Sequence, residues 1–146
     1  MTVTHLLDVN LLLALCDPRH VHHEAAHRWF KSVGGRSWAT CPFTENGFVR
    51  IASQPRYPNR PGGVAVVTAL LKCFCNQPKH VFWPDTITIR EDRVFNANHV
   101  LTSGQLTDVY LLALAVRQNG RLATLDGGIP ADAVSGGRPA LTVIAA

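Results

Sequence analysis

Charged side chains are scarce in this sequence, and long apolar runs are absent from it. Asp, Glu, Lys and Arg make up 16% of the 146 residues, against 47% for apolar residues. Intrinsically disordered chains have the opposite composition, with much charge and few apolar side chains. The composition therefore predicts a folded protein, and the length fits a single domain over residues 1–146 with a core of its own.

No apolar stretch approaches the roughly 20 residues that a membrane-spanning helix needs. The N-terminus also lacks the basic start and the small-residue cleavage site of a signal peptide, because Leu6 and Leu7 are followed at once by Asp8. We therefore expect a cytoplasmic protein with no membrane association.

The four cysteines do not form the two spaced clusters that are typical of a structural zinc site. Cys73 and Cys75 stand one residue apart near several histidines, but Cys16 and Cys41 are far from them in the sequence. Cytoplasmic proteins keep their thiols reduced, so disulfides are not expected. We interpret the cysteines as ordinary buried thiols rather than as zinc ligands.

Short β-branched and aliphatic segments alternate along the chain with helical patterns. Thr44 and Thr107 are expected to cap two of the helices, and residues 86–98 fit a strand and a helix about equally well. An order in which strands are separated by helices calls for an α/β fold, with a parallel sheet covered by helices on both faces. The expected strands are 3–7, 37–40, 81–83, 121–125 and 141–144, and the expected helices are 9–16, 22–33, 43–53, 64–76 and 108–118.

Four acidic residues stand at one edge of the expected sheet. Asp8 and Asp126 directly follow expected strands, while Glu45 and Asp108 stand in the first turns of helices that begin at the same edge. Right-handed crossovers bring the carboxyl ends of parallel strands together, and open α/β sheets bind their ligands there. Each acid alone is also explained by helix capping or by an ordinary turn, so the interpretation depends on all four together.

Carboxylates that lie close together repel one another unless a cation joins them. Hard divalent ions such as Mg²⁺ or Mn²⁺ prefer carboxylate oxygens as ligands. These ions also activate water and stabilise the charge that builds on a phosphate under in-line attack. The acidic residues therefore predict metal-assisted hydrolysis of phosphodiester bonds.

Four segments of the sequence carry a resemblance to a known family. In chain order they read L-L-D-V-N-L-L-L-A-L, W-A-T-C-P-F-T-E-N-G-F-V-R-I, L-T-D-V-Y-L-L-A-L-A and G-R-L-A-T-L-D. Together they resemble the PIN-domain ribonucleases, and among these the VapC toxins of type II toxin–antitoxin systems. The resemblance implies a PIN-like three-layer α/β/α sandwich, endonucleolytic cleavage of RNA with Mg²⁺ or Mn²⁺, a homodimer, and inhibition by a cognate VapB antitoxin.

The resemblance also implies roles for single residues. Asp8 and Asp108 match the acids that hold the metal ion. Glu45 matches the third catalytic acid, and Asp126 matches the fourth, more variable one. Small polar positions of the family that steady the acids through hydrogen bonds are matched by Asn10, Thr44 and Thr124.

Substrate choice is less well defined by the sequence. Residues 60–98 match no motif of the family, and a structured RNA such as tRNA or rRNA is one candidate substrate. The most basic segment, Arg50 to Arg60, contains Arg56 and Tyr57 among its prolines, and the whole chain has a formal charge of +4. This segment is either a contact for phosphates or a solvated loop.

Other functions fit the residues less well. Phosphatases with a nucleophilic Asp on similar sheets commonly have a second Asp two residues later, where this chain has Asn10. A dinucleotide-binding fold is disfavoured because no G-x-G-x-x-G follows the first strand. A purely structural domain would leave the grouping of acids to chance. A PIN-like module that binds RNA or protein without cleavage would be expected to have lost acids, and it remains the alternative.

Overall fold

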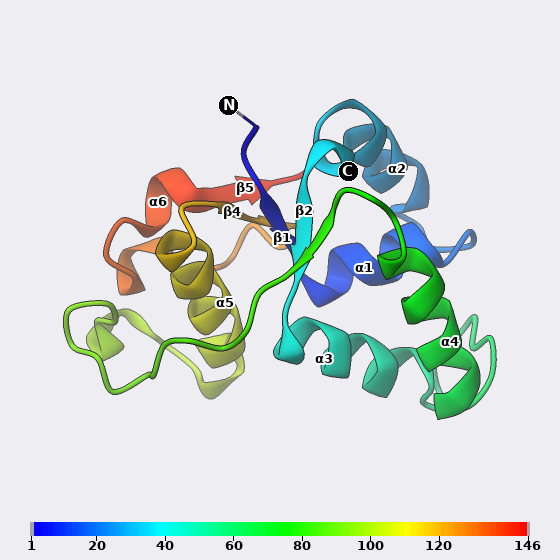
Figure 1. The fold of residues 1–146 in the computed structure, drawn as a ribbon. Coiled ribbons are helices and arrows are strands. Elements are labelled where there is room, and N and C mark those ends of the chain that lie inside the picture. The colour runs from blue at the N-terminus through cyan, green and yellow to red at the C-terminus, as the bar shows by residue number, and fades with distance from the viewer. Residues whose placement is uncertain (1, 146) are drawn as a thin grey trace.

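The computed structural model describes residues 2–145, and these contain one sheet of five short parallel strands. The strand order in space is β3-β2-β1-β4-β5, so that β1 lies in the middle (Figure 1). The sheet contains all five expected strands, but four of them are shorter than expected at one end, and β3 begins and ends one residue earlier than expected. The strands are β1 (His5–Leu7), β2 (Trp38–Thr40), β3 (His80–Phe82), β4 (Arg121–Thr124) and β5 (Leu141–Val143).

Helices cover both faces of this sheet, which confirms the three-layer α/β/α sandwich. One face packs against α1 to α4, and the other packs against α5 and α6 (Figure 1). No helix within residues 2–145 is both long and apolar enough to cross a membrane. The helices are α1 (Val9–Cys16), α2 (His23–Ser32), α3 (Pro42–Ala52), α4 (Val64–Cys75), α5 (Leu106–Arg117) and α6 (Gly137–Ala140), with 3-10 turns η1 (Gly34–Arg36), η2 (Ala97–His99), η3 (Ser103–Gln105) and η4 (Ala131–Ala133).

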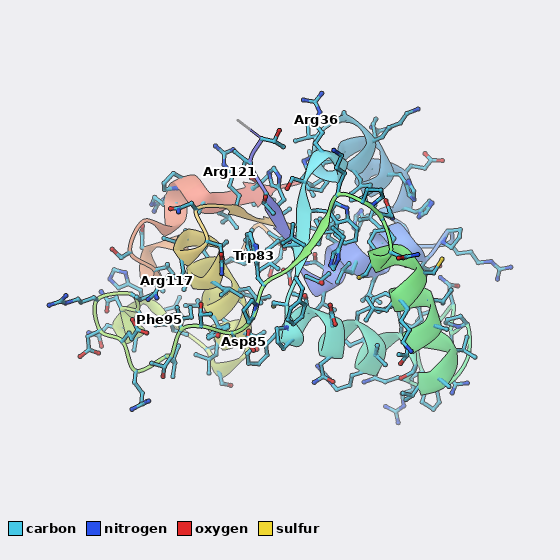
Figure 2. All side chains as sticks on the ribbon, viewed as in Figure 1. Arg36, Trp83, Asp85, Phe95, Arg117 and Arg121 are labelled. Atoms are coloured by element: carbon cyan, nitrogen blue, oxygen red, sulfur yellow. The ribbon has the colours of Figure 1, made fainter. Side chains whose placement is uncertain are left out.

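The connection from β3 to α5 explains the ambiguous pattern of residues 86–98. This segment runs along the α5 side of the sheet without forming a strand or an α-helix of its own (Figure 2). Trp83 and Phe95 are both buried in the apolar cluster that contains α5. Trp83 also requires a glycine at position 120, because a Cβ there would lie 2.6 Å from its ring. This segment is therefore held in place by contacts with distant residues of the core, and not by the hydrogen bonds of a helix or strand of its own.

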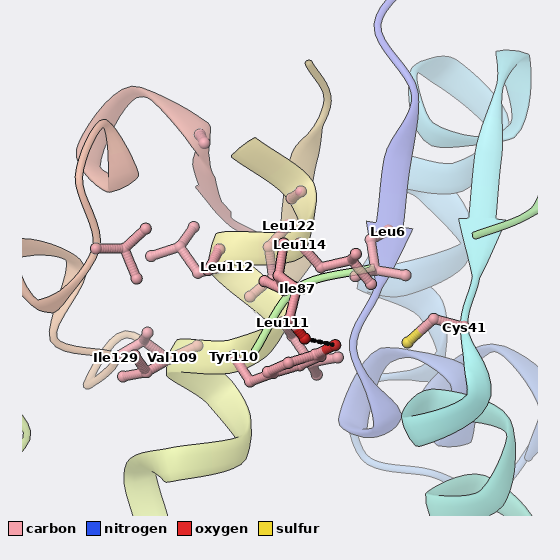
Figure 3. Packing of buried hydrophobic residues seen from close by; sticks show 14 of the residues in the cluster. Leu6, Cys41, Ile87, Val109, Tyr110, Leu111, Leu112, Leu114, Leu122 and Ile129 are labelled. Atoms are coloured by element: carbon pink, nitrogen blue, oxygen red, sulfur yellow. Dashed lines mark hydrogen bonds between the residues drawn. The ribbon is translucent and has the colours of Figure 1, made fainter. Parts of the chain in front are cut away.

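Successive strand residues point into opposite layers of the core. Leu6 of β1 and Leu122 of β4 face α5, whereas their neighbours Leu7 and Ala123 face α1. All four side chains are fully buried. Figure 3 shows Leu6 and Leu122 packed against the leucines of α5. Burial on both faces explains why the strands are continuously apolar rather than alternating.

The structure corrects both predicted helix caps. Cys41, not Thr44, is the N-cap of α3. Thr44 stands in the first turn of the helix, and its hydroxyl accepts the Cys41 backbone N–H at 2.9 Å. Helix α5 begins at Leu106, one residue before Thr107, because the turn η3 leads directly into it. The side chain of Gln105 stabilises that turn by accepting the Thr102 N–H at 3.1 Å.

The strand order creates a topological switch point between β1 and β4. From β1 the chain moves outward to β2 and β3, then returns to add β4 and β5 on the other side of β1. The connection that leaves β1 and the connection that leaves β4 run in opposite directions along the sheet. Their divergence leaves a crevice at the carboxyl ends of these two strands. Asp8 follows β1 and Asp126 lies just beyond the end of β4, so both acids stand at this crevice.

Candidate active site

Asp8 is held in a single orientation at the start of α1. Its Oδ1 accepts the Val9 backbone N–H at 2.8 Å, which makes Asp8 the N-cap of the helix. Its Oδ2 accepts the Thr124 hydroxyl at 2.7 Å. The side chain is only 5% exposed, and this burial raises its pKa against the lowering effect of the two hydrogen bonds. Asp8 is therefore a nearly buried carboxylate with a fixed position.

The Thr124 hydroxyl joins three of the residues at this crevice. It donates to Asp8 and accepts the Asp126 backbone N–H at 3.0 Å and the Asn10 side-chain amide at 3.1 Å. Asn10 in turn accepts the Leu125 N–H through Oδ1 at 3.1 Å. These bonds tie the end of β4 to the first turn of α1, as the resemblance implied for Asn10 and Thr124. Thr44 makes no such contact, because its hydroxyl bonds to Cys41 instead.

Asp108 and Asp126 complete a group of three aspartates with Asp8. Burial, followed by the charges of Asp8 and Asp126, raises the pKa of Asp108 to about 6. The charge of Asp126 also raises the pKa of Asp8. Asp126 itself is fixed by the Gly128 N–H, which its Oδ1 accepts at 2.8 Å. Three of the four predicted acids thus lie close enough to repel one another.

Glu45 has other neighbours. Its Oε2 accepts the Thr40 hydroxyl at 2.7 Å, and the same hydroxyl lies 2.7 Å from Nε2 of His80. Glu45 is not among the charges that shift the pKa of Asp8 or of Asp108. The hydroxyl at the end of β2 thus directs this carboxylate toward β3, away from the β1–β4 crevice. Its catalytic role stays a prediction.

Sequence reasoning did not find Thr40, although a signal for it was present. Strands β2 and β4 both end in Ala-Thr, at Thr40 and at Thr124. Each threonine is fully buried, and each donates its hydroxyl to one of the four acids. The pattern that would have identified Thr40 is a threonine at the carboxyl end of an apolar strand, with an acidic residue a few positions later in the chain or at the end of the neighbouring strand.

The three aspartates offer ligand atoms of the kind that a hard divalent cation binds, although within residues 2–145 their carboxylate oxygens do not all lie within 4.8 Å of one another. The available donors are carboxylate oxygens, and Mg²⁺ and Mn²⁺ prefer oxygen donors of this kind. Neither salt bridge found in residues 2–145 involves these aspartates, so no side-chain cation there neutralises them. A bound cation would relieve the repulsion that raises their pKa values.

Replacing Thr124 by Val should weaken this site without changing its shape. The variant removes the hydroxyl group that donates a hydrogen bond to Asp8. Loss of such supporting hydrogen bonds typically costs ~10–100-fold in metal affinity or activity. A Mg²⁺ titration followed by melting temperature, and an RNA cleavage assay, would measure the loss. Thr142→Val on the neighbouring strand β5 is the matched control. Equal behaviour of the two variants would contradict a supporting role for Thr124.

Two sequence relatives from Mycobacterium tuberculosis are similar to nearly the whole chain. The sequence is 47% identical over 131 residues to Ribonuclease VapC44, covering 90% of this chain and 92% of that protein. It is 41% identical over 135 residues to Ribonuclease VapC39, covering 92% of this chain and 96% of that protein. No protein-family model matches the sequence.

The fold is also that of a solved structure of another protein. It is the crystal structure of Mycobacterium tuberculosis VapC20, described as a sarcin-ricin loop cleaving toxin. The two structures align with a TM-score of 0.59 at 12% sequence identity, covering 89% of this chain and 95% of the other. The fold class predicted from the sequence is thus confirmed.

Proposed function

Because this chain belongs to the VapC family of PIN-domain ribonucleases, we propose that it is the endoribonuclease toxin of a type II toxin–antitoxin system. The observation that carries the proposal is the convergence of Asp8, Asp108 and Asp126 at the crevice between β1 and β4. We assign the activity to residues 1–146 as one nuclease domain, acting in the cytoplasm.

Asp8 and Asp108 are the proposed ligands of Mg²⁺ or Mn²⁺. When bound, such an ion lowers the pKa of a water molecule and stabilises the charge on the phosphate under attack. Asp8 presents its carboxylate from the rigid start of α1, and Asp108 presents its own from the first turn of α5. Because both groups belong to buried elements of the core, they need little reorganisation to hold a charge between them.

Asp126 and Glu45 complete the proposed set of catalytic acids. Asp126 adds negative charge beside Asp8, and its backbone N–H is fixed by Thr124. Glu45 would act on the substrate once its carboxylate turns away from the Thr40 hydroxyl. In that position it could accept a proton from the attacking water, as a general base.

The basic segment between α3 and α4 is a proposed contact for the RNA backbone. Arg56 and Arg60 are exposed there. The segment is anchored through Asp17, which accepts the Tyr57 hydroxyl at 2.7 Å and the Asn59 amide at 2.9 Å. A segment that is already ordered loses less conformational entropy when it binds a phosphate backbone.

Neutralising Arg56 and Arg60 together, as Gln, should weaken RNA binding and reduce its dependence on salt. For every phosphate that is no longer neutralised, the slope of log K against log salt should fall in magnitude by roughly 0.7–0.9. The measurement is RNA affinity of the catalytically inactive Asp108→Asn chain at several salt concentrations. Arg36 and Arg121, which lie at the opposite edge of the sheet, are the matched pair for a control (Figure 2). Identical salt slopes for both pairs would show that the segment is only a solvated loop.

We further propose the assembly that accompanies the family's activity. This consists of a homodimer and of a cognate VapB-type antitoxin that blocks the nuclease site. The substrate is an RNA, with structured RNAs such as tRNA or rRNA as the first candidates. Sequence recognition in such RNAs usually targets unpaired bases of loops, so the cleavage site should be single-stranded.

A second candidate function is a PIN-like module that binds RNA or protein without cleaving it. The orientation of Glu45 toward Thr40 favours it, because only three acids then share the crevice. Incubation of purified protein with RNA separates the two functions. Cleavage that requires a divalent ion and stops with EDTA supports the nuclease, whereas binding without cleavage supports the alternative.

A further inference from the structure

A second group of possible metal ligands surrounds the hydroxyl of Thr40. One ligand atom each from Glu45, Cys75 and His80 lies within 4.8 Å of the other two. All three side chains are half-buried, so an ion from solvent can reach them. This group lies beside β2 and β3, whereas the three aspartates lie between β1 and β4.

Three different elements bring these ligand atoms together. Glu45 comes from the first turn of α3, Cys75 is the last residue of α4, and His80 is the first residue of β3. Cys75 and His80 thus flank the short α4–β3 turn, with four residues between them. Closely spaced ligands on a turn, joined by one from a distant helix, are common in zinc sites.

The side chains are positioned before any ion binds. The imidazole of His80 packs against the ring of Trp38, with ring centroids 4.7 Å apart. Its Nε2 and Oε2 of Glu45 are each 2.7 Å from the Thr40 hydroxyl. The two ligand atoms therefore contact the same hydroxyl, and Sγ of Cys75 lies within 4.8 Å of each of them.

The spacing of the atoms suits a tetrahedral ion. Zinc bonds of ~2.0–2.3 Å place ligand atoms roughly 3.3–3.8 Å apart, so small side-chain rotations from the present separations are enough. Three protein ligands leave one position for water or another small ligand.

We propose that Glu45, Cys75 and His80 form a binding site for Zn²⁺, separate from the aspartate site. The mixture of sulfur, nitrogen and oxygen donors suits zinc and is poorly suited to Mg²⁺. On binding, the Cys75 thiol loses its proton to solvent and its sulfur bonds the ion. Nε2 of His80, which carries the proton in its contact with the Thr40 hydroxyl, releases that proton to solvent; Nδ1 takes one up from solvent, and the ion binds the freed Nε2 lone pair. The Thr40 hydroxyl keeps Glu45 as its acceptor and no longer contacts His80. The sequence alone favoured ordinary thiols because His80 and Glu45 come close to Cys75 only in the fold.

The zinc site goes beyond the proposed nuclease function, although Glu45 belongs to both. An ion bound by Cys75 and His80 would hold the Glu45 carboxylate on the β3 side of β2. Occupancy of this site therefore opposes the turn of Glu45 that we propose for catalysis.

Cobalt is a suitable probe for this site, because Co²⁺ takes the place of Zn²⁺ and is coloured. The full-length, reduced protein is titrated with Co²⁺ in buffer without Mg²⁺. One equivalent should bind with a sulfur-to-cobalt charge-transfer band and the visible bands of tetrahedral cobalt, and one equivalent of Zn²⁺ should remove both. This readout does not depend on RNA cleavage, so it can fail or succeed independently of the nuclease proposal.

Variants assign the spectrum to residues. Cys75→Ser should abolish the charge-transfer band, and His80→Gln should weaken Co²⁺ binding by at least ~10-fold. Cys73→Ser is the matched control, since that thiol is exposed on the same helix two residues away, and it should leave the band unchanged. Asp108→Asn should also leave it unchanged. Absence of the band in the wild type, or its persistence in Cys75→Ser, would overturn the proposal.

Discussion

The Asp8→Asn variant is expected to keep the fold and to cleave RNA at least ~100-fold more slowly than the wild type. This loss is larger than the one expected when only a hydrogen bond that supports a metal ligand is removed. Asparagine is as good an N-cap as aspartate, so α1 should begin normally. What the variant lacks is one negative charge at the β1–β4 crevice. In the absence of metal it should melt at a higher temperature than the wild type, because the repulsion with Asp126 and Asp108 is relieved.

Asp132→Asn is the control for this prediction. Asp132 is an exposed aspartate that pairs with Arg138 at 2.6 Å, outside the crevice. Its neutralisation should leave the rate of RNA cleavage unchanged. A collapsed Asp8→Asn protein would show that the carboxylate is needed for folding, and an active one would remove Asp8 from the metal site.

Magnesium is expected to stabilise the folded protein strongly. An ion that binds only the native state at a hundred times its Kd adds ~2.7 kcal/mol to the free energy of unfolding. For a chain of this length that corresponds to roughly 8–11 °C in Tm. A thermal melt with and without Mg²⁺ measures the shift, which Asp108→Asn should largely remove. An equal shift in both proteins would place the ion somewhere other than at Asp108.

The stabilisation by Mg²⁺ should also depend on pH. Burial, and then the charges of Asp8 and Asp126, raise the pKa of Asp108 to about 6 in the folded chain, above the unfolded value of 3.8. At a pH between these two pKa values, the Asp108 carboxyl is largely protonated in the folded chain and largely ionised in the unfolded chain. Without metal, Asp108 therefore costs stability above pH 6, and this cost disappears as the pH falls toward 4.

Comparison of wild type with Asp108→Asn isolates this effect from other titrating groups. Because Asp108 is half-exposed, the difference in free energy of unfolding should be only about 1 kcal/mol at pH 7. It should vanish near pH 4, and the Mg²⁺ shift of the wild type should shrink over the same interval because protons compete with the ion. A difference that is independent of pH would contradict the raised pKa.

The parts of the site that follow from strand order were predictable from the sequence. Asp8 and Asp126 come directly after or just beyond apolar strands, and parallel strands bring their carboxyl ends to one edge. The position of Asp108 follows from α5, whose nearly continuous apolar residues require a buried helix that starts at the same edge. These inferences need only local patterns and the handedness of crossovers.

The orientation of Glu45 was not predictable in this way. Its helix was placed correctly, but its carboxylate is directed by Thr40, five residues earlier, and shares that hydroxyl with His80 from another strand. The single hydrogen bond from the Thr40 hydroxyl to Glu45 decides which of two neighbouring sites the side chain faces. Local sequence carries no period or propensity for such a choice.

Helix starts failed for a similar reason. Thr44 and Thr107 both satisfy the composition of an N-cap. In the structure Pro42 follows the cap of α3, and η3 runs into α5, so each helix begins earlier than its threonine. Proline at the first helical position and a capping turn outweighed the threonine signal.

Cleavage of total cellular RNA by the purified chain is the most direct test of the central claim. The reactions contain wild type with Mg²⁺, wild type with EDTA, and Asp108→Asn with Mg²⁺. We expect discrete fragments only from the wild type with Mg²⁺, and sequencing of their ends would identify the target RNA. Fragments of equal abundance from Asp108→Asn, or from the wild type in EDTA, would contradict a nuclease centre built on these aspartates.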